Sequence, residues 1–358
     1  MNDNFAETPQ GQNRTLINRT LVRIKVLQVV FAYYQNEGEG LPESGEDGTK
    51  QKAQTLCDAR KQLEKSYEDT YNLYLLLLDL VYELTRYAQQ RMEDAQERAK
   101  IMHTPFEANW RFANNRFAQQ LFENKTLRSA IEERRLGWDA AHESLGTLYK
   151  QIADSSFYEE YMSKEDCSYD DDKAIWRKIF NNLLTDNTEM ENALEELEIA
   201  LDGRDWTVEA DMVISYVVKT IKRFKEDNGA NQLLLEMFQE DKNAWAGTGN
   251  KNKECKFGER LLDSVVKNSE EYENLIVSCL KNWDKERLSY MDMIILKVAL
   301  AEITTFPDIM LQVSMNEYID IAKEYSSENS PMFINGILEE AVATLKRENK
   351  LLKAVSAE

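Results

Sequence analysis

Four basic side chains near the N-terminus are the residues of this sequence best suited to binding chemistry. Arg14, Arg19, Arg23 and Lys25 lie within the segment RTLINRTLVRIK. A guanidinium fork binds phosphate bidentately, and single-stranded bases stack on guanidinium planes. We therefore interpret this segment as a candidate polyanion-binding helix front. The alternative interpretation of each residue is a solvated cationic face of a helix.

No comparable arrangement of residues in the sequence indicates catalysis or metal binding. The four cysteines lie far apart without a CxxC pair, and the two histidines do not accompany them at zinc-ligand spacing. No Ser-His-Asp or Cys-His set can be assembled, so we expect no catalytic residues, no metal site and no cofactor. The residues concerned are Cys57, Cys167, Cys255, Cys279, His103 and His142.

The charge of the chain is unevenly distributed. The formal net charge is −20, which argues against a nucleic-acid binder. Residues 1–36, however, hold four basic side chains against two acidic ones, and residues 254–358 hold 12 against 19, which leaves −15 for residues 37–253. Because charges are screened beyond about 8–10 Å at ordinary salt, the acidic middle need not oppose a distant basic patch.

The composition predicts an all-α protein. Only five prolines occur, none of them between Pro105 and Pro307, and good helix formers dominate that stretch. The densest apolar run, LYLLLL, is shorter than the ~20 residues of a membrane helix, and the N-terminus lacks a secretory signal pattern. We expect a cytoplasmic protein with no membrane association.

Hydrophobic periodicity places the elements. A first helix is predicted at about 14–35, a flexible connection at 37–52, and a long core helix at about 53–100. The helix RLSYMDMIILKVALAEITTF is apolar nearly all round, so it should be central and buried. Ser330 is expected to cap a last helix with Pro331 at its first position. Further helices are predicted at about 107–135, 138–152, 173–184, 188–200, 207–226 and 230–240.

A second glycine-containing segment, AGTGNKNKECK at 246–256, is predicted to be a linker. It lacks the GxxxxGK[ST] pattern of a phosphate-binding loop. Its Lys251, Lys253 and Lys256 could contact a polyanion.

The elements and their order resemble the NusB family of bacterial transcription antitermination factors. The resemblance rests on RIKVLQVVFAYYQ near the N-terminus and, further on, on FGERLLDSV, RLSYMDMIILKVALAEI, VSMNEYIDIAKEY and SSENSPMFINGILEE. It implies an all-α, NusB-like helical bundle split by a large inserted helical domain. The first helix of that bundle would span 14–36, the acidic insertion with flexible ends 37–253, and the remainder 254–352.

The resemblance also implies a function. Members of the family bind boxA-type RNA of ribosomal RNA operon transcripts together with the ribosomal protein NusE, within an RNA polymerase antitermination complex. Arg14, Arg19, Arg23 and Lys25 would then correspond to the arginine-rich RNA-binding front. Phe333 would lie near the RNA, although its place in an apolar stripe also suits a core anchor. Asp292 would contact NusE, although an acidic residue in a first helical turn is also favoured by the helix dipole.

Two other functions remain open at this point. One is a protein-only helical scaffold whose acidic insertion binds basic partners. The other is a NusB-like domain associated with a ribosomal RNA methyltransferase, but no strand-rich cofactor domain follows the NusB-like part here.

Overall fold

The described part of the chain forms two compact units. The computed structural model describes residues 15–37, 46–204, 206–238, 253–280 and 288–351. One unit, here called the middle unit, comprises Met1–Leu16 and Glu68–Met237; the other, the bundle unit, comprises Ile17–Tyr67 and Phe238–Glu358. The predicted partition of the chain at residues 37 and 253 stays a prediction.

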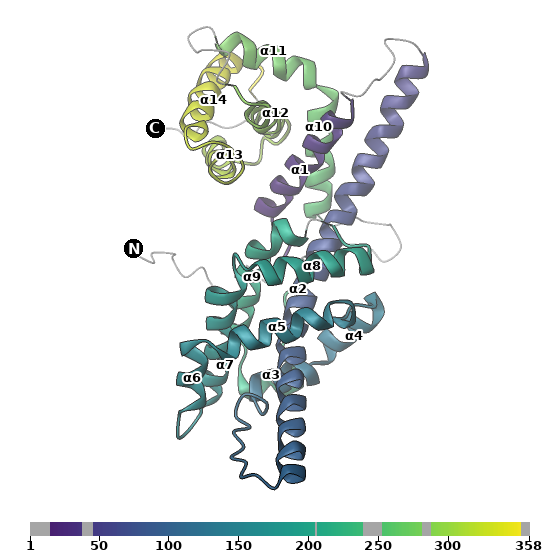
Figure 1. Ribbon diagram of the computed structural model, residues 1–358. Helices are drawn as coiled ribbons and strands as arrows, with labels where there is room; N and C mark the ends of the chain where they lie inside the picture. Colours follow the sequence, from purple (N-terminus) through teal and green to yellow (C-terminus); the bar gives the residue numbers. More distant parts are fainter. Residues whose placement is uncertain (1–14, 38–45, 205, 239–252, 281–287, 352–358) are drawn as a thin grey trace. The chain divides into compact units, whose positions relative to one another are not determined.

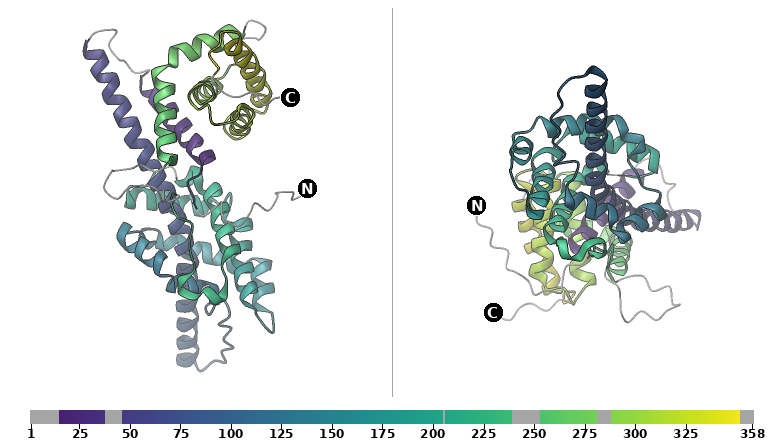
Figure 2. Two further views of the ribbon diagram at one scale, coloured as in Figure 1. Left: turned by 180° about the vertical axis from the view of Figure 1, so that it is seen from behind. Right: turned by 90° about the horizontal axis from the view of Figure 1, so that it is seen from below.

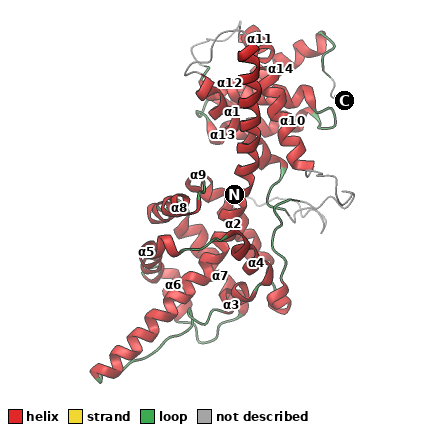
Figure 3. Cartoon of the chain, turned by 90° about the vertical axis from the view of Figure 1, so that its right-hand side faces the viewer, coloured by secondary structure: helices red, strands yellow, loops and turns green. Residues whose placement is uncertain are grey.

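Helices are the regular elements of the described residues, which confirms the all-α fold class (Figure 3). Pairing of the β type is limited there to an isolated bridge between Thr15 and Glu236. Within the described ranges, none of the helices combines the length and the hydrophobicity that a membrane-spanning segment requires. The α-helices are α1 (Arg19–Glu37), α2 (Glu46–Met102), α3 (Arg116–Glu123), α4 (Lys125–Arg134), α5 (His142–Ala153), α6 (Ser156–Met162), α7 (Tyr169–Ile179), α8 (Thr188–Leu201), α9 (Trp206–Arg223), α10 (Lys253–Lys267), α11 (Ser269–Cys279), α12 (Tyr290–Thr305), α13 (Leu311–Tyr325) and α14 (Ser330–Arg347). The 3₁₀-helices η1 (Asp139–Ala141) and η3 (Glu226–Asn231) and the π-helix η2 (Phe180–Leu184) complete the described helical elements.

Helix α12 is the centre of the bundle unit, as its apolar sequence predicts. It packs against α1, α10, α11, α13 and α14, which surround it (Figure 1). Every residue from Ile294 to Ile303 is buried. Two of these ten positions are charged, Lys297 and Glu302, and both are therefore expected to have partners inside the unit.

Helix α1 begins later than its sequence pattern predicts. Residues 16–18 are not helical, and the amide of Leu21 donates to Oδ1 of Asn18 at 3.0 Å. An asparagine side chain that accepts from a first-turn amide is a typical helix N-cap, so Asn18 sets the start of α1 at Arg19. The predicted start at residue 14 was too early.

The middle unit is built on the second part of α2, which the sequence predicts as a core helix. The run Leu73–Leu78 is fully buried there. The indole N–H groups of Trp138 and Trp206 donate to the carbonyls of Leu76 and Asp69 at 3.0 and 2.9 Å. These bonds let two large aromatic side chains lie against α2 without an unsatisfied buried donor. The other helices of the middle unit lie alongside this part of α2 (Figure 2).

Other predicted boundaries were also wrong, and one of them is the linker at 246–256, inside which α10 begins at Lys253. The region 107–135 is two helices, α3 and α4, because Asn115 and Asn124 each accept a hydrogen bond from an amide three residues later and so start a new helix. No α-helix forms at 230–238; that segment includes the bridge at Glu236. Helix α2 begins at Glu46, inside the segment predicted as a flexible connection.

Candidate nucleic-acid interface

The three described basic residues of the α1 front lie in three different environments. Arg19 is partly exposed, whereas Arg23 and Lys25 keep 2% and 1% of their surface exposed. Arg14 lies outside the described residues. The structure therefore does not gather Arg19, Arg23 and Lys25 on one exposed surface.

Arg23 forms a buried, bidentate ion pair with Glu302 of α12. Its Nε donates to Oε2 of Glu302 at 2.7 Å, and its Nη2 donates to Oε1 at 2.8 Å. A third guanidinium nitrogen, Nη1, lies 3.2 Å from Oε2 of Glu317 on α13. This fork-to-carboxylate geometry is the strongest that arginine makes. Arg23 therefore joins α1 to α12 and α13, and its donors are committed to protein carboxylates.

Glu302 is held in its ionised form by these neighbours. Burial by itself would raise its pKa, but the hydrogen bonds and charge of Arg23, with hydrogen bonds from Ser314 and Tyr318, lower the pKa below the ordinary glutamate value. Ser314 Oγ donates to Oε1 at 2.6 Å and Tyr318 Oη donates to Oε2 at 2.9 Å. The carboxylate is thus fully surrounded by donors from α1 and α13.

Lys25 also lies inside the bundle unit. Its exposed fraction of 1% places it among the largest fully buried side chains of the chain. A side chain with so little exposed surface cannot contact a ligand unless α1 moves.

Among the described residues at the front of α1, Arg19 is the cation that remains available. It forms no ion pair with another described residue. Its guanidinium carbon instead lies 5.4 Å from the centroid of the Phe257 ring on α10. A guanidinium over an aromatic face is attracted to the ring quadrupole while its N–H edges stay available. Phe257 therefore orients Arg19 without neutralising it.

Phe333, the predicted aromatic near the RNA, belongs to the core of the bundle unit. It lies in α14 with 8% of its surface exposed, beside the buried Ile334 and Ile337. This position agrees with the core-anchor alternative. Its role in RNA contact stays a prediction.

Asp292, the predicted NusE contact, is 1% exposed and ties three segments together. It forms a capping box with Ser289 at the start of α12. Its Oδ1 accepts from Ser326 Oγ at 2.6 Å, and its Oδ2 accepts from Ser330 Oγ at 3.1 Å. Because the Ser330 hydroxyl is used here, it does not cap α14, whose N-cap position is Asn329. The predicted capping role of Ser330 was wrong, whereas Pro331 does lie in the first turn of α14.

Sequence reasoning missed two residues that define this site. Glu302 decides the position of Arg23, and Phe257 decides that of Arg19. One signal for Glu302 was available, since a carboxylate inside a helix that is apolar on every side needs a buried cationic partner. No comparable signal marks Phe257, which reads as an ordinary core aromatic.

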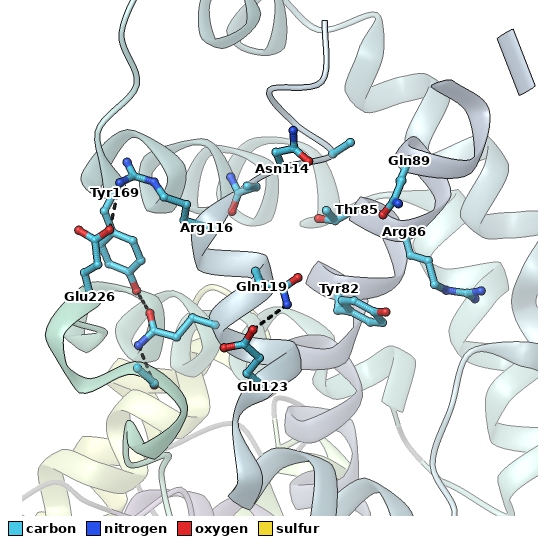
Figure 4. Close-up of a pocket in the computed structure, with 14 residues that line it drawn as sticks. Tyr82, Thr85, Arg86, Gln89, Asn114, Arg116, Gln119, Glu123, Tyr169 and Glu226 are labelled. Atoms are coloured by element: carbon cyan, nitrogen blue, oxygen red, sulfur yellow. Dashed lines mark hydrogen bonds and ion pairs between the residues drawn. The ribbon is translucent and has the colours of Figure 1, made fainter. Parts of the chain in front are cut away.

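The middle unit contains a polar cleft of about 420 Å³ (Figure 4). Its two arginines are both paired with carboxylates. Arg86 Nη2 lies 2.6 Å from Glu83, and Arg116 lies 3.0 Å from each of Asp172 and Glu226. The cleft therefore presents no unpaired arginine to an anion. Among the described residues, no group of three or more histidine, cysteine or acidic side chains is arranged to hold a metal ion.

Comparisons with known proteins define the class to which this helical bundle belongs. The sequence profile of the NusB family matches residues 215–343, which include all of α10 to α13 and most of α14. The chain is 35% identical over 112 residues to the transcription antitermination protein NusB of Geobacter sulfurreducens, covering 78% of that protein and 31% of this chain. No solved structure matches the chain.

Two further relatives carry the same name. The NusB protein of Geobacter sp. strain M21 is 30% identical over 148 residues, which is 94% of that protein and 40% of this chain. The NusB protein of Clostridium botulinum is 42% identical over 88 residues, which is 62% of that protein and 25% of this chain. The chain belongs to the NusB family. More than half of it lies outside each of these matches.

Proposed function

We propose that this protein is a transcription antitermination factor that binds boxA-type RNA of ribosomal RNA operon transcripts together with the ribosomal protein NusE. It would act by presenting RNA and NusE together to the RNA polymerase antitermination complex, without catalysis. The family supplies the class of function, and the environments of the basic residues supply the roles below.

The observation that carries the proposal is the contrast between Arg19 and Arg23. The two lie one turn apart on α1, yet Arg23 is committed to Glu302 while Arg19 has no ion pair with another described residue. In a chain of net charge −20, an arginine oriented by an aromatic ring and left without a carboxylate is suited to an external anion. Arg19 is therefore the proposed RNA contact, and Arg23 the residue that positions the helix carrying it. Arg14 precedes this turn and stays in the proposed RNA-binding set.

NusE is proposed to bind near the start of α12. The Asp292 carboxylate is occupied by serines, but the neighbouring Tyr290 is 50% exposed. The Tyr290 ring contacts that of Phe31 of α1 edge to face, with a centroid distance of 5.5 Å. An exposed aromatic supported by a second ring is a common anchor of protein interfaces. Tyr290 is therefore the proposed direct contact, with Asp292 shaping the segment beneath it.

A mobility-shift titration with boxA RNA, with and without NusE, tests the proposal. The full-length protein is compared with Arg19→Ala and with the control Arg347→Ala, which removes the same charge from an exposed arginine at the end of α14. We expect Arg19→Ala to weaken RNA binding by about tenfold and to reduce the slope of log affinity against log salt by about 0.7, the value for one single-strand phosphate contact. Arg347→Ala should change neither quantity.

Three outcomes have distinct meanings. No RNA binding by the unaltered protein, even with NusE, would contradict the RNA proposal. Retained NusE binding in that case would favour a protein-only scaffold. RNA binding that is equally unaffected by Arg19→Ala and Arg347→Ala would remove Arg19 from the site.

A further inference from the structure

Arg260 of α10 shares with Arg19 a property that sets the two apart in the bundle unit. Neither forms an ion pair with another described residue, whereas the other described arginines of the unit are all paired. Arg260 is exposed, and its polar contact among the described residues is a long one of 3.4 Å from Nη2 to the carbonyl of Thr305. The paired arginines are Arg23 with Glu302, Arg60 with Asp263 and Arg347 with Glu340.

The two unpaired guanidinium groups are joined by a pair of aromatic rings. Arg260 lies 4.7 Å from the centroid of the Phe306 ring, just as Arg19 lies 5.4 Å from that of Phe257. The two rings contact each other with a centroid distance of 4.7 Å. The rings are 5% and 8% exposed, so the groups available to a ligand are the guanidinium planes above them. The result is one continuous row, Arg19, Phe257, Phe306 and Arg260, contributed by α1, α10 and the end of α12.

Helix α10 carries further basic side chains on the face that holds Arg260. Lys253, Lys256 and Arg260 are exposed and spaced i, i+3 and i+7, so they share one face of the helix. Phe257 lies on the same face. The acidic residues Glu254 and Glu259 occupy other angular positions of α10. A chain that is acidic in total therefore presents a local basic stripe here.

We propose that α10 forms a second wall of the RNA site, on which Arg260 contacts the same single strand as Arg19. This inference rests on the proposed RNA-binding function and adds to it. Single-stranded RNA suits the row because its phosphates accept guanidinium hydrogen bonds and its bases stack on guanidinium planes. An acidic protein segment would form ion pairs with the two arginines, but it has no bases that stack on their guanidinium planes.

The test uses the full-length protein, boxA RNA and NusE. We expect Arg260→Ala to weaken RNA binding about tenfold and to lower the salt slope by about 0.7, with Arg347→Ala as the charge-matched control. Arg260→Lys keeps the charge but loses the planar group, so it should recover the salt slope and only part of the affinity. Arg260→Gln serves if the alanine variant is unstable in thermal melts.

The outcomes separate this inference from the function on which it rests. If Arg19→Ala weakens RNA binding while Arg260→Ala and Arg260→Gln bind with unaltered affinity and slope, the second wall is refuted and the proposed function stands. If the unaltered protein does not bind RNA, both fail. Polyglutamate should displace the RNA poorly; displacement as effective as that by a competing unlabelled strand would assign the row to an acidic protein partner and overturn the inference.

Discussion

Arg23 and Glu302, 279 residues apart in the chain, form a two-bond ion pair at 2.7 and 2.8 Å that is almost wholly closed to solvent. It fastens the first helix of the bundle unit to its central helix. The hydroxyls of Ser314 and Tyr318 also donate to Glu302, so both oxygens of the carboxylate accept hydrogen bonds from arginine and from a hydroxyl. Loss of Arg23 would therefore leave the Glu302 charge buried without its cationic partner, whereas Arg23 also lies 3.2 Å from Glu317.

Arg23→Ala is expected to lower the free energy of unfolding by about 3–5 kcal/mol, the usual cost of removing one partner of a buried pair. Urea denaturation of the purified protein measures this. Arg347→Ala is the control, because its pair with Glu340 is exposed and such pairs contribute about 0–1 kcal/mol. A loss below 1 kcal/mol for Arg23→Ala would contradict the structural role assigned to Arg23.

The pair also predicts a pH dependence. The pKa of Glu302 is lower in the folded protein than the ordinary value near 4.3. At pH values near that ordinary value, the folded state therefore binds fewer protons at this residue than the unfolded state does. The stabilisation by Glu302 is therefore present above the unfolded-state pKa and is lost as the pH falls through the folded-state pKa. We expect the stability difference between the unaltered protein and Glu302→Gln to be large at pH 7 and to shrink below about pH 4. Denaturant titrations of both proteins at matched pH values check this, and a difference independent of pH would contradict it.

The fold was largely predictable because its main signals are local. The scarcity of proline, the largely apolar α12 and the LYLLLL run of α2 predict the helices and the core without any knowledge of contacts. The failures lie where one side chain decides a boundary. Asn18, Asn115 and Asn124 each begin a helix through a hydrogen bond to a backbone amide. Asparagine occurs inside and outside helices, so the sequence alone does not show which ones act as caps.

The sequence predicts where the candidate RNA site lies in the chain, but not which of its basic residues are available to a ligand. The basic front of α1 can be read from the chain, but Arg19 and Arg23 lie on the same stripe, and nothing in their spacing distinguishes them. Both guanidinium groups lie near the Phe257 ring of α10, and their difference arises from a carboxylate on α12 that is remote in sequence and pairs with Arg23. The same holds for Asp292, whose serine partners come from the α13–α14 turn.

Substitutions at Asp292 and Tyr290 are expected to have different effects, the first on the free energy of unfolding and the second on NusE binding. Asp292→Ala removes a capping box and the carboxyl acceptor for two buried or partly buried hydroxyls, so we expect it to cost about 2–4 kcal/mol of unfolding free energy. Tyr290→Ala, on an exposed ring, should change stability little and weaken NusE binding by at least about tenfold, as an interface anchor does. Thermal melts and calorimetric titration with NusE measure the two effects. Unchanged NusE affinity in Tyr290→Ala would place the NusE contact elsewhere.

Gly258 and Tyr67 show how closely α10 approaches α2 within the bundle unit. A Cβ added at Gly258 would lie 2.3 Å from Tyr67 Oη and 3.0 Å from Val22 Cγ1. The Tyr67 hydroxyl is itself buried and finds no hydrogen-bond partner among the described residues. Gly258→Ala is therefore expected to lower the free energy of unfolding by about 1–3 kcal/mol through overpacking.

Tyr67→Phe should act in the opposite direction. It removes a buried, unsatisfied hydroxyl and leaves the ring in place, so we expect a gain of about 1 kcal/mol in the free energy of unfolding. In this background Gly258→Ala should cost less than in the unaltered protein, because the atom that a Cβ would meet first is gone, although Val22 still limits the space. A double-mutant cycle by urea denaturation measures the coupling. Strict additivity of the two substitutions would show that the Tyr67 hydroxyl is not what restricts residue 258 to glycine.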